Sequence, residues 1–156
     1  MTNANSGLWL SHLRALKLFY QSLLLPLEDS LPPWDGDALE REEAPIWHLG
    51  HACFDLCRVL LQPYGDRELS GRYGEIFLGL NAHQPWEAEP PHRGELIQWW
   101  EASLERIEEY LPRYQGAPQF VLVLDEWPIE TPAQAWEYAL FHTGFHLGRI
   151  HQMIGW

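Results

Sequence analysis

Apolar residues recur at steps of three and four along four segments of the chain, which is the period of an amphipathic α-helix. The segments cover residues 7–27, about 44–61, 93–113 and 132 to the C-terminus. Pro26 marks the end of the first segment, and Pro45 stands in the first turn of the second. Residues 131–134, Thr-Pro-Ala-Gln, have the layout of a capping box that opens the last helix.

The connections between these segments are long. Residues 28–43 are rich in proline and acid and predict a loop, and residues 62–92 predict a long, aromatic-lined loop that can include a short helical turn. Residues 120–124 are β-like, but no partner strand can be identified, so we expect an extended connection there. Such connections either form functional loops over one end of the fold or count against the helix assignment. The predicted fold class is all-α, an up-and-down-type four-helix bundle with long connecting loops, formed as one domain over residues 1–156.

The charge balance excludes several classes of partner. The 156 residues include 22 Asp and Glu against 10 Lys and Arg, for a net charge of −12. Nucleic acids and anionic membranes require clustered basic residues, so neither is expected as a partner. The first residues lack a basic region, and polar residues interrupt the apolar stretch that follows, which predicts neither a signal peptide nor a membrane span and favours the cytoplasm.

Histidines supply the candidate chemistry. His142 and His146 are four residues apart and therefore lie on one face of the last helix, whereas His151 is rotated by about half a turn from His142. His48 and His51 lie on the second helix, so one or both can face the last helix across the fold. Three neutral imidazoles on facing helices would form a metal site with open coordination positions. The opposing interpretation is that an HxxxH pair arises by chance among 8 histidines and that these are ordinary core residues.

Two stretches carry a family resemblance. PIWHLGHACFD in the second helix and HTGFHLGRI in the last resemble the DinB/YfiT-like metalloprotein superfamily, which includes the N-terminal domain of ergothioneine-pathway sulfoxide synthases. The resemblance implies a homodimeric DinB-like four-helix bundle that binds a divalent metal ion. The family's W-x-L-x-H pattern falls on Trp47, Leu49 and His51, and its H-x-x-x-H-x-G pattern falls on His142, His146 and Gly148. The implied metal ligands are His51, His142 and His146, although Leu147-Gly148-Arg149 departs from the Arg-Gly-Gln of many members.

Other residues keep two interpretations each. His48 is a fourth ligand or a neighbour of the ligands, and Asp55 accepts a hydrogen bond from a ligand imidazole or faces solvent. Cys53 and Cys57 are expected to be packed thiols rather than zinc ligands. Surface or loop roles are expected for His12, His83 and His92. Core or dimer-interface positions are expected for Trp99, Trp100 and Trp136. Three more tryptophans fall in the connections, where they could line a pocket: Trp34, Trp86 and Trp127.

Two functions from different classes follow. The first is a metal-dependent thiol transferase or hydrolase in which Zn, Ni or Fe activates a small-molecule thiol or water. The second is a non-catalytic metal-binding homodimeric module in which the ion stabilises the bundle. The sequence shows no clear general base beside the ligands, which favours the module, and it assigns no catalytic residue.

Overall fold

A computed structural model describes residues 4–27, 31–32, 40–124 and 126–155 of the chain. The protein is mostly helical, with four long helices. These are α1 (Ala4–Phe19), α2 (Pro45–Leu60), α4 (Arg93–Tyr110) and α5 (Pro132–Ile154). The helical segments predicted from the sequence pattern are therefore confirmed. Within the described part of the chain, no helix combines the length and the apolar character that crossing a membrane requires.

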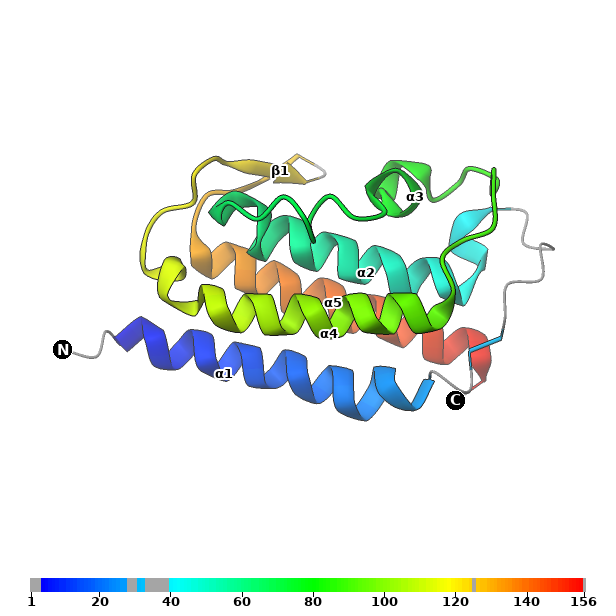
Figure 1. Cartoon of the computed structure of the whole chain (residues 1–156), viewed down its shortest axis with the longest axis horizontal. Coiled ribbons are helices and arrows are strands. Elements are labelled where there is room, and N and C mark those ends of the chain that lie inside the picture. Colours follow the sequence, from blue (N-terminus) through cyan, green and yellow to red (C-terminus); the bar gives the residue numbers. More distant parts are fainter. Residues whose placement is uncertain (1–3, 28–30, 33–39, 125, 156) are drawn as a thin grey trace.

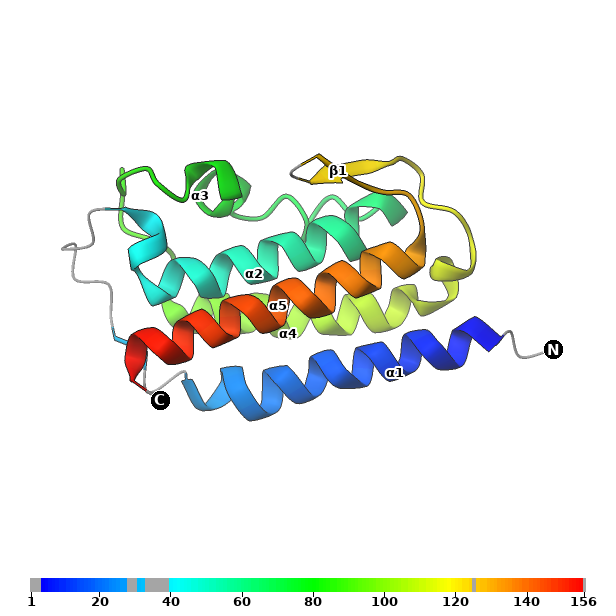
Figure 2. The same cartoon turned by 180° about the vertical axis from the view of Figure 1, so that it is seen from behind.

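The four long helices lie side by side (Figures 1 and 2). Helix α2 contacts both α4 and α5, and α1 contacts the same two helices from the other side. Helices α2 and α4 run in the same direction, whereas α1 and α5 run in the opposite one (Figure 1). The alternating order of an up-and-down bundle is therefore not confirmed. The physical reason is the long connection after α2, which carries the chain back along the molecule before α4 begins.

Short helical turns extend or join the long helices. The first helix continues through a π-helical turn and a 3₁₀ turn, and α4 continues into a 3₁₀ turn at Pro112, which lacks the amide hydrogen that an α-helix needs. The connection after α2 contains the short helix α3, which confirms the predicted helical turn. The π-helical turn covers Tyr20–Leu24, and the short α-helix α3 covers Gly74–Phe77. The 3₁₀ turns cover Leu25–Leu27, Arg41–Glu43, Gln62–Tyr64, Gly79–Asn81 and Leu111–Gln115.

The connection before α5 contains a small hairpin. Strand β1 (Leu122–Leu124) pairs antiparallel with β2 (Trp127–Ile129), so Leu122 lies opposite Ile129. The prediction of an unpaired extended segment was therefore wrong. Pro128 hides the partner strand in the sequence, because proline is unfavourable inside a sheet but is tolerated in an edge strand. Leu124 and Ile129 are buried, which anchors the hairpin over the helices.

The core confirms the packing roles expected of several side chains. Trp99, Trp100 and Trp136 are fully buried, and the indole of Trp100 donates a hydrogen bond of 3.0 Å to the carbonyl oxygen of Leu49. Cys53 and Cys57 are free, buried thiols near the hydroxyl of Ser103 on α4. The connections contain the remaining predicted positions: Trp86 packs partly against the core, Trp127 is exposed, and Trp34 lies outside the described residues.

Helix α3 is fastened to α2 by a close contact between an aromatic ring and a glycine. The ring of Phe77, which is fully buried, occupies the space where a β-carbon on Gly50 would stand. Any other residue at position 50 would push this ring away. This contact therefore fixes the position of the segment that follows α3 relative to α2.

We expect the Gly50→Ala substitution to destabilise the fold by about 1–3 kcal/mol, because the added methyl group overpacks the Phe77 contact. Gly148→Ala is the matched control, since nothing lies within 4 Å of a β-carbon built at that exposed helical position. Replacing glycine there should stabilise the helix by about 0.5–1 kcal/mol. Urea unfolding of both variants measures the two changes, and an equal effect at both positions would contradict the contact.

Candidate metal centre

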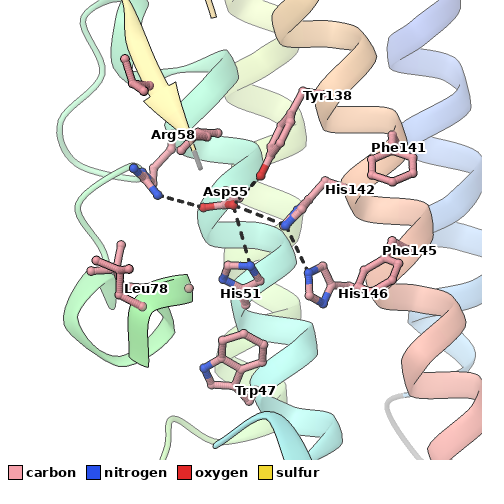
Figure 3. A pocket seen from close by; sticks show the side chains of 14 residues that line it. Trp47, His51, Asp55, Arg58, Leu78, Tyr138, Phe141, His142, Phe145 and His146 are labelled. Atoms are coloured by element: carbon pink, nitrogen blue, oxygen red, sulfur yellow. Dashed lines mark hydrogen bonds and ion pairs between the residues drawn. The ribbon is translucent and has the colours of Figure 1, made fainter. Parts of the chain in front are cut away.

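Three histidines from two helices converge at one point. His51 lies on α2, and His142 and His146 lie one turn apart on α5 (Figure 3). One ring nitrogen of each lies within 4.8 Å of those of the other two, so the group could hold a metal ion. His151 is not part of the group, as its helical phase predicts. A second group in the described residues, Glu40, Glu42 and His83, includes no buried member.

The ring of His51 is held from two sides. Its Nδ1 lies 2.6 Å from the carbonyl oxygen of Phe77, and the ring stacks on Trp47 with centroids 4.5 Å apart and an interplanar angle of 9°. A carbonyl oxygen can only accept a hydrogen bond, so Nδ1 must carry the hydrogen. In the neutral ring the lone pair is then on Nε2, which faces the other two histidines.

A relay of hydrogen bonds orients His146 in the same way. Nε2 of His48 lies 2.9 Å from the carbonyl oxygen of Glu42 and must therefore donate its hydrogen. Nδ1 of neutral His48 is then an acceptor, so Nδ1 of His146, at 2.8 Å, is the donor. This leaves the lone pair of His146 on Nε2, inside the cluster. His48, which the sequence left ambiguous, thus lies behind His146 and is not in the three-nitrogen group.

The third imidazole completes the arrangement. Nε2 of His142 lies 3.1 Å from Nε2 of His146 and 3.4 Å from Oδ2 of Asp55, and its ring stacks on Tyr138. Because Nε2 of His146 accepts, Nε2 of His142 donates. Moving this one hydrogen to Nδ1 of His142 would turn three Nε2 lone pairs toward a common point.

Burial keeps the imidazoles of His48, His142 and His146 neutral. Desolvation lowers the pKa of His142 to about 4, although the neighbouring Asp55 carboxylate opposes this shift. Desolvation likewise lowers the pKa of His48 to about 4, and it lowers the pKa of His146 further, with the adjacent histidines adding to the effect. Neutral imidazole is the form that binds a metal ion. The residues present therefore fit a divalent ion that accepts nitrogen ligands.

The carboxylate of Asp55 lies beside the Nε2 atoms of His51 and His142. Its Oδ2 accepts a hydrogen bond of 2.9 Å from the Tyr138 hydroxyl and lies 3.8 Å from Nε2 of His51, while Oδ1 accepts one of 3.2 Å from Arg58. The sequence offered Asp55 as an outer hydrogen-bond partner of a ligand, but that role belongs to the Phe77 carbonyl for His51 and to His48 for His146. The carboxylate instead stands beside two of the candidate ligand atoms.

Tyr138 and Arg58 also belong to the site, although the sequence patterns did not single them out. Tyr138 precedes His142 by four residues, so helical spacing alone places it on the same face as the histidines. Arg58 follows Asp55 by three residues on α2 and pairs with its carboxylate. The same spacing rule that selected the histidines could have found both residues.

An open pocket lies above the cluster. Its volume is about 680 Å³, and the histidines, Asp55 and Arg58 form its polar part. Its apolar walls come from the turn after α3, from β1 and from α5: Leu78, Leu80, Val123, Leu124, Phe141 and Phe145. Trp127 lines an adjoining pocket, whereas Trp86 lines neither. Cys53 and Cys57 are not among the residues of the pocket or of the metal-binding groups found in the described chain.

Comparison of the chain with profiles of known protein families, with curated proteins and with solved structures found no match. The resemblance to the DinB-like superfamily therefore rests on the motif residues alone.

The relay through His48 predicts a graded effect on metal affinity. His48→Leu can neither donate to Glu42 nor accept from His146, so we expect zinc affinity to fall about 10–100-fold. In His48→Gln the side-chain amide can do both, so affinity should stay close to that of the wild type. Competition with a chromophoric chelator measures the affinity, and imidazole ¹⁵N shifts report the tautomer of His146. Equal losses in the two variants, with the wild-type tautomer in both, would contradict the relay.

Proposed function

We propose that this chain is a divalent-metal-binding protein in which His51, His142 and His146 hold the ion and the pocket above them takes a small molecule. In its fuller form the proposal includes a DinB-like four-helix bundle, a homodimer in the cytoplasm, and metal-dependent thiol-transferase or hydrolase chemistry. Zn, Ni and Fe all accept such ligands.

The observation that carries the proposal is the common direction of the ring nitrogens. A histidine cluster that only fills a core would need no particular tautomer. Here two partners outside the cluster, the Phe77 carbonyl and His48, bond Nδ1 of His51 and of His146 and leave Nε2 toward the centre. The cluster also borders an open pocket, where a ligand of the ion could enter.

Asp55 supports the catalytic form of the proposal. A divalent ion on three imidazoles supplies a Lewis acid that lowers the pKa of a thiol or of water. Among the chain's own residues, Asp55 can receive the proton, because its carboxylate lies within 4 Å of two candidate ligand nitrogens and lines the pocket. Tyr138 and Arg58 fix its orientation. The sequence shows no clear general base beside the ligands, and Asp55 fills that role in this proposal.

One observation favours the non-catalytic alternative. The three histidines come from α2 and α5, two helices that pack directly against each other. An ion bound by all three would tie these helices together and stabilise the fold without turnover.

Metal content tests the ligand set. Protein purified without a histidine tag and given zinc should hold one ion per chain. His142→Ala should lose the ion, because its nitrogen is part of the converging group, whereas His151→Ala should retain it. Elemental analysis after dialysis measures both variants. A wild-type chain that retains no metal would refute the proposal, and equal loss in the two variants would refute the assignment of ligands.

Turnover separates the enzyme from the module. We expect zinc-loaded wild type to join a small thiol to an electrophilic substrate or to hydrolyse an activated ester. Asp55→Asn should retain zinc but lower kcat about 100-fold or more, since it removes the proton acceptor. Glu130→Gln, an exposed change before α5, is the control and should leave kcat unchanged. Metal-loaded wild type without turnover on any thiol or ester would support the module instead.

A further inference from the structure

The pocket has a polar floor and unusually exposed apolar walls. Leu80 is 82% exposed and Phe141 is 72% exposed, and both line the pocket that contains the histidines. Large apolar side chains that gather in the open around a pocket mark a binding surface. In Figure 3, Phe141 and Phe145 stand on α5 beside His142 and His146.

The apolar surface continues beyond the histidines. A second pocket of about 710 Å³ shares Leu124, Tyr138 and Phe141 with the first and extends along β2 to Trp127, which is 74% exposed. Each volume lies within the range of small-molecule sites. Together the two pockets offer a long apolar tract that begins at the metal-binding residues and passes the hairpin.

The charges at the two ends of this tract differ. Asp55 and Arg58, 3.2 Å apart, compensate each other, and coordinating imidazoles are neutral. The two charges of a bound divalent ion would therefore remain uncompensated at the floor. At the far end, Glu137 is the only charged side chain among the described residues that line the second pocket, and it would repel an anion there.

We propose that the site binds an amphipathic small molecule with one anionic head, directed to the histidines, and an uncharged apolar tail laid between Phe141 and the hairpin. This inference rests on the proposed metal binding. It names the ligand class that the proposed function leaves open, namely monoanions with an extended hydrocarbon part rather than cations, dianions or compact polar anions.

A series of matched probes tests the ligand class by calorimetry on zinc-loaded protein. Affinity should rise about three- to fourfold for each methylene added from hexanoate through octanoate to decanoate, because the tail buries apolar area. Octylammonium should bind at least about tenfold more weakly than octanoate, because its positive head is repelled by the positive charge of the ion. Octanedioate should also bind more weakly, because its second carboxylate lies near Glu137.

Variants locate the tail. Phe141→Ser should weaken octanoate binding about tenfold, through lost apolar contact, while zinc content stays unchanged. Leu18→Ser removes an apolar side chain that is 59% exposed on α1, which lines neither of these two pockets, and should change nothing. Zinc content is measured on every sample. A chain that takes up no zinc refutes both proposals, whereas a loaded chain that binds hexanoate, decanoate and octylammonium equally refutes only the ligand class.

The exposed side chains of Leu80, Phe141 and Trp127 form an apolar rim around the pockets, and a second copy of the chain is the one competing occupant of this rim. Sedimentation of the wild type and of Phe141→Ser distinguishes this case. A dimer that the substitution dissociates, together with a loaded protein that does not bind octanoate, would identify the rim as a contact between copies and overturn the proposal.

Discussion

A neutral imidazole carries one lone pair and one hydrogen, and the whole site depends on this constraint. For three rings to turn lone pairs to one point, the opposite nitrogen of each must find an acceptor in a crowded interior. Backbone carbonyl oxygens are the final acceptors for two of the rings: that of Phe77 accepts directly from His51, and that of Glu42 accepts from His48, which in turn accepts from His146. Both carbonyls come from segments outside the long helices. The connections are therefore part of the site and not only links between its helices.

The position of the Phe77 carbonyl depends in turn on packing. The Phe77 ring rests on α2 at Gly50, one residue before His51, so the contact and the hydrogen bond lie side by side. Trp47, one helical turn earlier, stacks on a face of the His51 ring. A glycine, an aromatic ring and a carbonyl thus form one unit with the candidate ligand. The orientation of His51 is built into the core and does not rely on exposed contacts.

The features that were predicted correctly from the sequence are those that depend on the periodicity of side chains along a helix. Helical spacing located the four long helices and separated His142 and His146 from His151, and the motif resemblance chose His51 over His48. The hairpin was missed because Pro128 argues locally against a strand, although β1 pairs with it. The contacts of Phe77 and Glu42 were missed because they use carbonyl oxygens, which every residue possesses and no residue type signals. The common direction of α2 and α4 depends on the route of a long connection, which periodicity does not describe.

The hairpin has a consequence for how this protein could change over time. Strands β1 and β2 border the pockets but supply none of the histidines or their hydrogen-bond partners. The hairpin side of the pockets therefore belongs to a different piece of chain from the residues that would hold an ion, although α5 contributes to both. Because a surface connection tolerates substitution and insertion far better than a packed helix, selection could alter the hairpin to fit a longer or shorter molecule and leave the nitrogen cluster intact. New specificity would then arise without passing through a protein that has lost its metal site.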